Sequence, residues 1–208
     1  MGERHINFAS GDLGIDGLFE NTSGDRGVVV THPHPLYGGD MHNGVVQSVV
    51  EVYRKAGYST LRFNFRGVGA SEGTYDNGVG EQEDVESALQ FLSDQGKRKI
   101  DLVGYSFGAW VNALGSWRLE RVARMIMVSP PVSFLAFPDL SDNPQIELVI
   151  AGTRDEFADL GTLRATLQSW SPTAALKTIE GADHFYTGRL REVEGTLWEF
   201  LEGRGESE

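Results

Sequence analysis

A serine stands between two glycines in the stretch "KIDLVGYSFGAWVNAL", residues 99–114, where Gly104 and Gly108 flank Ser106. An apolar run typical of a β-strand ends at this pattern, and a run with helical spacing begins there. A sharp strand-to-helix turn is the context of a serine nucleophile, since the glycines allow close backbone approach and the helix N-terminus stabilises a neighbouring anion. The alternative is a glycine-rich turn without chemistry, which is common in open α/β folds.

A serine nucleophile needs a base, and His184 in "EGADHFY" is the one histidine that follows Ser106 in the chain. His184 comes directly after the last predicted strand, so a loop at the carboxyl edge of a sheet would carry it toward Ser106. Taken alone, a histidine in a loop is more often polar surface. The order of residue types, serine before acid before histidine, favours a base.

Asp155 in "LVIAGTRDEF" is the predicted acid that orients His184, because it follows a buried strand by a short turn. Its simpler interpretation is an N-cap for a helix that starts near Glu156. Asp183 is a rival acid, but side chains of adjacent residues point apart. Asp159 is another rival, although it falls inside a predicted helix. These considerations favour a Ser106, His184 and Asp155 triad.

The elements that must position this triad alternate between apolar strands and amphipathic helices. Strands are predicted at 4–10, 14–21, 26–32, 58–65, 99–105, 122–129, 146–152 and 174–181. Helices are predicted at 42–57, 80–94, 107–119, 156–170 and 188–203. This rhythm indicates an α/β fold with a mostly parallel sheet of about eight strands, helices on both faces and an antiparallel N-terminal hairpin. Residues 1–203 are predicted to form one domain, and 204–208 a flexible tail.

The composition limits the cellular compartment and the classes of binding partner that we expect for this protein. A net charge of −12 argues against nucleic acid or an anionic membrane as a partner, because both are recognised through Lys and Arg. The absence of Cys excludes disulfides, thiolate metal sites and a cysteine nucleophile. The first ten residues, "MGERHINFAS", lack the apolar segment of a signal peptide. The sequence therefore predicts a cytoplasmic protein with a small-molecule substrate.

Five motifs make the chain resemble the α/β-hydrolase superfamily, and more narrowly the small lidless hydrolases related to dienelactone hydrolases and peptidase-like esterases. They are "THPHPLYGGDMHNGVV", "LRFNFRGVGASEG", "GYSFGA", "AGTRDEF" and "GADHFYTGRL". Dienelactone hydrolases use a cysteine nucleophile where this chain has Ser106. The resemblance implies an α/β-hydrolase fold and no cofactor. The connection from Pro130 to Gln145 is too short to build the cap domain that many relatives insert there.

The resemblance also implies the role of each residue in the predicted site. Ser106 would be the nucleophile, His184 the base and then the acid, and Asp155 its orienter. The backbone amide of Phe107 would supply half of an oxyanion hole. The other half would come from "HPHPLYGG", where the prolines have no amide to donate, which leaves His34 or Leu36 and favours His34.

Other residues near these motifs have less specific signals. An apolar acyl pocket would have walls from Leu36, Tyr37, Tyr105, Phe134 and Tyr186, although most such side chains are core residues. Arg66 either meets a substrate anion or, as we favour, ties down its loop through a carboxylate such as Glu72. His32 and His34 lack carboxylate or Cys partners at ligand spacing, so no metal site is expected.

The sequence thus predicts a serine hydrolase that cleaves carboxylic esters with small or accessible acyl groups through an acyl-enzyme. An amidase or short-peptide hydrolase would use the same triad. A protein of this fold that binds a ligand or partner without catalysis is the alternative from a different class.

Overall fold

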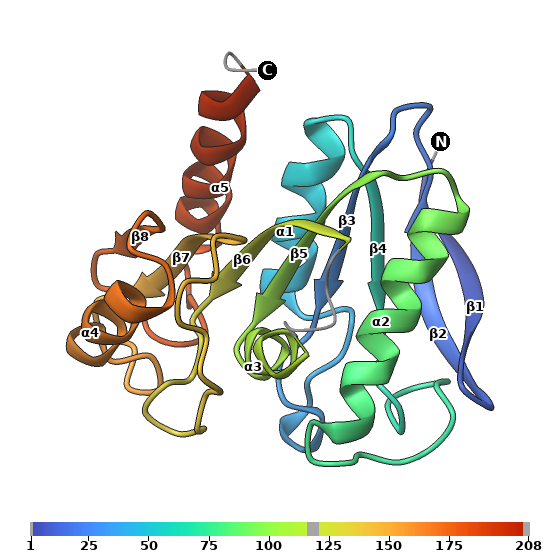
Figure 1. Ribbon diagram of the computed structural model, residues 1–208, viewed down its shortest axis with the longest axis horizontal. Coiled ribbons are helices and arrows are strands. Elements are labelled where there is room, and N and C mark those ends of the chain that lie inside the picture. The colour runs from blue at the N-terminus through green and yellow to red at the C-terminus, as the bar shows by residue number, and fades with distance from the viewer. Residues whose placement is uncertain (1, 116–120, 206–208) are drawn as a thin grey trace.

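The computed structural model describes residues 2–115 and 121–205 of the chain (Figure 1). Its strands are β1 (Arg4–Ser10), β2 (Leu13–Glu20), β3 (Arg26–Thr31), β4 (Ser59–Phe63), β5 (Lys99–Tyr105), β6 (Val122–Val128), β7 (Ile146–Gly152) and β8 (Ala175–Ile179). Its helices are the 3-10 turn η1 (Pro35–Tyr37), α1 (Gly44–Lys55), α2 (Val79–Asp94), α3 (Phe107–Leu114), α4 (Leu160–Trp170) and α5 (Leu190–Gly205). Every predicted strand is present, with ends shifted by a few residues at most.

The strands form one sheet in the order β1-β2-β4-β3-β5-β6-β7-β8. β1 pairs antiparallel with β2, and β2 antiparallel with β4, whereas all other neighbours are parallel. The predicted mostly parallel sheet with an antiparallel N-terminal hairpin is therefore confirmed. The chain leaves β3 toward β4 on one side and later returns to β5 on the other. Ligands of open α/β sheets bind at the carboxyl ends of strands at such a reversal.

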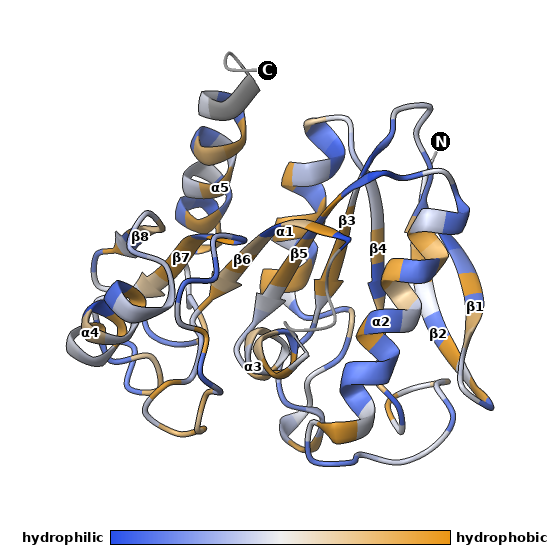
Figure 2. Ribbon diagram, viewed as in Figure 1, coloured by the Kyte–Doolittle hydropathy of each residue, from blue (hydrophilic) through white to orange (hydrophobic). Residues whose placement is uncertain are grey.

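Helices cover both faces of the sheet, and a separate apolar core lies on each face. α1 and α5 pack on one face, where Val28 and Val30 of β3 contribute to the core. α2, α3 and α4 lie on the other face, and the intervening Val29 points into that core. Figure 2 shows the apolar strands at the centre of the molecule. In the described part of the chain, no helix has the length and apolar character that crossing a membrane requires.

Most helix ends differ from the sequence prediction: α1, predicted at 42–57, is two residues shorter at each end, and α2, predicted from 80, starts one residue earlier. α3 is described to Leu114, and most of the remainder of the predicted 107–119 helix lies outside the described residues. α5 continues to Gly205, past the predicted boundary at 203, and residues 206–208 of the predicted tail are outside the described residues. The helix predicted at 156–170 is present as α4, but its predicted start at 156 was wrong. α4 starts at Leu160, because Asp159 is its N-cap and accepts a hydrogen bond from the Thr162 amide at 2.8 Å.

The connection between β6 and β7 carries no inserted cap. This segment, which is described throughout, contains turns but neither a helix nor a strand. The carboxyl edge of the sheet is therefore not covered by a domain built from it.

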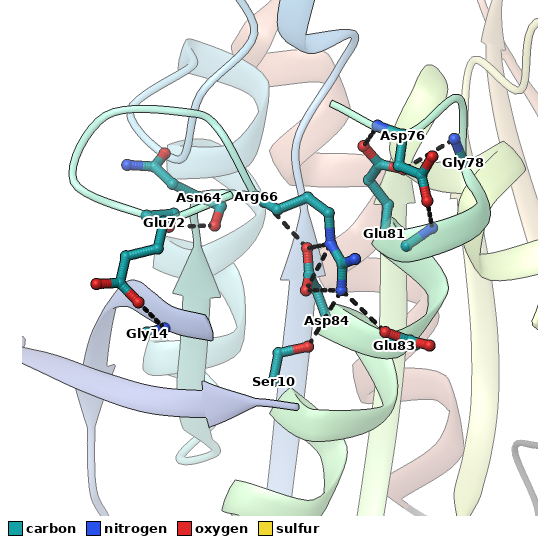
Figure 3. A network of polar contacts seen from close by, with 12 residues as sticks. Ser10, Gly14, Asn64, Arg66, Glu72, Asp76, Gly78, Glu81, Glu83 and Asp84 are labelled. Carbon is teal, nitrogen blue, oxygen red and sulfur yellow. Dashed lines mark hydrogen bonds and ion pairs between the residues drawn. The ribbon is translucent and has the colours of Figure 1, made fainter. Parts of the chain in front are cut away.

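Arg66 ties down its loop, but through a different carboxylate from the one expected (Figure 3). Its guanidinium donates to Asp84 of α2, with Nη2 2.8 Å from Oδ1, and to Glu83 at 3.2 Å. Glu72, the expected partner, instead accepts a hydrogen bond from the Gly14 amide of β2 at 2.7 Å. Arg66 is buried, so its charge is satisfied within the protein and does not face a substrate.

A buried ion pair joins β5 and β6 at the edge opposite to Ser106. Arg124 donates to both carboxylate oxygens of Asp101, at 3.0 and 2.6 Å, and Tyr53 donates to the same carboxylate at 3.0 Å. Burial raises the pKa of Asp101, while the bonds from Arg124 oppose that shift. Arg124 thus compensates part of the cost of burying the Asp101 carboxylate.

We expect Arg124→Met to lower the free energy of unfolding by about 3–5 kcal/mol, because it leaves the Asp101 carboxylate buried without its cation. Urea unfolding at pH 7 measures this change. Arg98→Met is the matched control, since Arg98 makes the same type of pair with Asp25 on the surface and should change stability little. Equal losses in the two variants would contradict the importance of burial at Asp101.

Candidate active site

Ser106 occupies a strained turn between the end of β5 and the start of α3. Its backbone has φ 53° and ψ −116°, and a positive φ is unfavourable for any residue with a Cβ. The Ser106 amide donates to the Val128 carbonyl of β6 at 2.9 Å, which helps to hold the turn against this strain. The predicted strand, sharp turn and helix are all present.

The two glycines that flank Ser106 allow the backbone to pack closely around it. A Cβ on Gly104 would lie 2.5 Å from the Ala109 backbone nitrogen, inside the first turn of α3. A Cβ on Gly108 would lie 2.5 Å from Oγ1 of Thr31 at the end of β3. Real Cβ atoms do not approach so closely, so both positions require glycine. This packing brings the loop after β3 against the N-terminus of α3.

Ser106, His184 and Asp155 form one chain of hydrogen bonds. Ser106 Oγ lies 2.9 Å from His184 Nε2, and His184 Nδ1 lies 2.9 Å from each carboxylate oxygen of Asp155. An ionised carboxylate only accepts, so Nδ1 carries the proton and Nε2 is free to accept the proton of the serine hydroxyl. The structure thus brings together the three residues that the sequence singled out, in the geometry of a nucleophile, a base and an orienting acid.

Asp155 holds its own loop as well as His184. Its Oδ1 accepts hydrogen bonds from the amides of Phe157 and Ala158, each at 2.9 Å. Burial alone would raise the pKa of Asp155, but the hydrogen bond and charge of His184 and the backbone donors outweigh it and lower that pKa. Asp155 therefore stays ionised at neutral pH. The capping interpretation and the orienting interpretation both describe this residue.

The rival acids lie elsewhere. Asp183 accepts a hydrogen bond from the Thr187 amide at 3.0 Å and shapes the loop that carries His184. Asp159 caps α4. Neither makes a hydrogen bond to His184, and both remain exposed or partly exposed.

Tyr105 and Tyr186 lie in the core rather than on the wall of a pocket. Tyr105 is buried and donates its hydroxyl proton to the His184 carbonyl at 2.9 Å. Tyr186 is fully buried, and its hydroxyl is 2.7 Å from Ser129 Oγ. Burial raises the pKa of both phenols, so they stay protonated. Residue type alone suggested that Tyr105 and Tyr186 line an apolar pocket, but both side chains lie in the core beneath the loop that carries His184.

The loop after β3 carries the two amides, of His34 and Leu36, that were candidates for the second half of the predicted oxyanion hole. The Leu36 amide donates to His34 Nδ1 at 3.2 Å and is therefore engaged. In residues 2–115 and 121–205, the amides of His34 and Phe107 have no hydrogen-bond partner within the protein. The His34 ring packs on the Phe107 ring with a centroid distance of 4.7 Å. His34, rather than Leu36, as the second donor stays a prediction, which its unpaired amide supports.

His32 is a structural residue, with both ring nitrogens bonded inside the protein. Its Nε2 lies 3.0 Å from the Phe65 amide, which can only donate, so Nδ1 carries the proton and donates to the Pro33 carbonyl at 2.6 Å. Neither nitrogen is available to a metal ion. The side chain joins the ends of β3 and β4 beneath the loop of His34.

Large apolar side chains stand exposed around the turn of Ser106. Three were expected from the sequence: Leu36, Tyr37 and Phe134, with 67%, 85% and 73% of their surface exposed. Sequence analysis missed Phe157 and Phe185, whose rings pack against the His184 ring with centroid distances of 4.6 and 5.5 Å. Their proximity to Asp155 and His184 in the chain was the available signal.

The fold and the serine turn define the class of α/β serine hydrolases. The chain belongs to the alpha/beta hydrolase family, whose sequence model matches residues 28–192. It is similar to a protein from Rickettsia prowazekii, with 33% identity over an alignment of 183 residues that covers 83% of this chain and 77% of the relative.

Two solved structures of serine hydrolases resemble the whole chain. One is a homologue from Coxiella burnetii, with 33% identity, a TM-score of 0.89 and coverage of 97% of this chain and 98% of the other. The second is a serine hydrolase without a lid from Xanthomonas campestris, with 29% identity, a TM-score of 0.87 and coverage of 98% and 95%. The absence of a cap between β6 and β7 agrees with the latter description.

We expect His32 to make the stability of the protein depend on pH. Burial lowers its pKa to about 4 from the ordinary value of 6.5. Between these values the unfolded chain binds more protons than the folded protein, so stability falls by about 3 kcal/mol as the pH drops through this window. Urea unfolding at pH 7 and pH 4.5 measures the loss.

His32→Gln removes the titrating group and keeps an acceptor for the Phe65 amide. The fall in the free energy of unfolding from pH 7 to pH 4.5 should therefore be smaller in this variant than in the unmodified protein, by about 2 kcal/mol. His42→Gln, at an exposed histidine, should keep the full dependence. An unchanged dependence in His32→Gln would refute the assignment.

Proposed function

We propose that this chain is a serine esterase that hydrolyses accessible carboxylic esters through an acyl-enzyme. The observation that carries the proposal is the hydrogen-bonded chain from Ser106 through His184 to Asp155, at the carboxyl edge of a sheet with no cap inserted between β6 and β7. An amide substrate would use the same groups, but its leaving nitrogen needs more assistance than an alcohol. A site without an inserted cap has fewer groups to give that assistance, so we favour an ester as the substrate.

In the first half of the proposed reaction, Ser106 Oγ attacks the ester carbonyl while His184 Nε2 accepts the hydroxyl proton. The carbonyl oxygen becomes an oxyanion and accepts hydrogen bonds from the amides of Phe107 and His34. Asp155, ionised and bonded to Nδ1, stabilises the imidazolium that forms. His184 then gives its proton to the alcohol oxygen as the bond to the acyl carbon breaks.

In the second half, water attacks the acyl carbon and gives a proton to His184 Nε2. The bond to Ser106 Oγ then breaks, and His184 returns the proton to that oxygen. The carboxylic acid leaves, and the protein is restored. The proposed steps use only side chains and amides of this chain, together with water.

The first test is the hydrolysis of p-nitrophenyl esters from acetate to decanoate. We expect turnover by the unmodified protein and a fall in kcat of at least about 10³-fold in Ser106→Ala, because the triad acts as a unit. Equal urea midpoints for the two proteins would show that the fold is intact.

Absence of Ser106-dependent turnover on every ester would contradict the esterase proposal. Hydrolysis of p-nitroanilides would then indicate an amidase. Failure of a fluorophosphonate to label Ser106 would instead favour a binding protein without catalysis.

A second test separates the two neighbouring carboxylates. Asp155→Asn should lower kcat at least about 100-fold, because an amide at this position favours the wrong tautomer of His184. Asp183→Asn should change kcat by no more than about threefold, since that side chain only shapes the loop. Steady-state kinetics on p-nitrophenyl acetate measure both. Similar losses in the two variants would argue against Asp155 as the orienting acid.

A further inference from the structure

Three phenylalanine rings gather around His184, two of them in contact with its ring and the third packed on one of these two. Phe157 packs on the His184 ring with a centroid distance of 4.6 Å, and Phe134 packs on Phe157 at 5.0 Å. Phe185 also contacts the His184 ring, at a centroid distance of 5.5 Å and nearly edge to face. We call Phe134, Phe157 and Phe185 the phenylalanine ledge.

The ledge exposes apolar surface that folding alone does not explain. Phe134 is 73% exposed and Phe185 is 66% exposed. Apolar groups gathered on a surface mark binding sites more often than those scattered singly. The ledge draws on three segments, the β6–β7 connection, the β7–α4 loop and the β8–α5 loop, which only the tertiary fold brings together.

The ledge is held rigidly to Asp155 and hence to His184. The Phe157 amide donates to Asp155 Oδ1 at 2.9 Å, while the Phe157 carbonyl accepts from the Ser133 amide at 3.0 Å. The same carboxylate accepts from His184 Nδ1 at 2.9 Å. A ligand on the ledge would therefore be positioned relative to the imidazole.

The chemistry of the proposed function decides which part of an ester reaches this ledge. His184 Nε2 donates the proton to the leaving alcohol, so the alcohol oxygen must lie within about 2.6–3.2 Å of Nε2. In the proposed reaction the carbonyl oxygen instead accepts from the amides of Phe107 and His34, two residues whose rings pack on each other at 4.7 Å. The group attached to the alcohol oxygen is therefore the part of the ester nearest to the rings on His184.

Resting on the proposed function, we propose that the phenylalanine ledge binds the alcohol part of the ester, and that preferred substrates carry an aromatic or comparably large apolar alcohol group. An aromatic ring gains from offset or edge-to-face contact with Phe134 and Phe185, beyond the burial of its surface. Small alkyl alcohols do not reach these rings. The ledge thereby selects the leaving group rather than the acyl group.

The test compares kcat/KM for 1-naphthyl acetate and ethyl acetate, which give the same acetyl-enzyme. Because kcat/KM covers the steps up to acylation, the comparison isolates the alcohol part. Each of Phe134→Ala and Phe185→Ala should lower kcat/KM for the naphthyl ester by about three- to tenfold, from the energy of one aromatic contact. The same variants should change kcat/KM for ethyl acetate by less than about twofold. Phe157 is left intact because its ring is the nearest of the three to that of His184, at 4.6 Å, and is only partly exposed, whereas Phe134 and Phe185 are largely exposed.

Val79→Ala is the matched control, since Val79 is 66% exposed, as Phe185 is, but lies at the start of α2. Val79→Ala should leave kcat/KM unchanged for both 1-naphthyl acetate and ethyl acetate. Among p-nitrophenyl esters, Phe134→Ala and Phe185→Ala should lower kcat/KM by the same factor for acetate and for decanoate.

Equal losses on naphthyl and ethyl acetate would overturn the proposal, because the ledge would then only position His184. Losses that grow with acyl length would also overturn it, because the ledge would then bind the acyl chain. A failure of the esterase proposal is recognised separately, since the unmodified protein would then show no Ser106-dependent hydrolysis of any of these esters.

Discussion

The close contact between β5, α3 and β3 is the constraint on which the site depends. Ser106 keeps a positive φ because Gly104 and Gly108 let the backbone of α3 and the end of β3 approach without a side chain between them. The turn presents the serine oxygen to His184 and leaves the Phe107 amide without an internal partner. One packing arrangement thus exposes a hydroxyl, a backbone donor and a helix N-terminus at the same point.

Asp155 plays a comparable role for the loops. Its carboxylate accepts from His184 and from two amides of the segment before α4, so the orientation of the imidazole and the course of that segment depend on one buried charge. The same bonds place Phe157 against His184. The orientation of the His184 imidazole and the position of the Phe157 ring therefore depend on the same buried carboxylate.

The buried tyrosine and histidine side chains show that the position of a residue in the fold, and not its type alone, decides its role. Tyr105 supports the loop of His184 from inside the core, and His32 joins two strand ends beneath the loop of His34. Both residue types also suit a substrate pocket or a metal site. The sheet decides between these roles, because a side chain that points into a core beside a carbonyl or an amide is fully engaged there.

The sequence by itself determined the α/β fold and the order of strands and helices along the chain, and it singled out Ser106, His184 and Asp155 as the candidate triad. These predictions rest on local signals, namely apolar periodicity and polar residues at strand ends. Such signals do not depend on how the strands and helices pack against one another. Only the tertiary structure decided that Arg66 pairs with Asp84, that Tyr105 and Tyr186 are core residues, and that Phe134, Phe157 and Phe185 gather beside His184. The physical reason is that each of these contacts joins segments distant in the chain, so its partner is set by the packing of side chains in three dimensions.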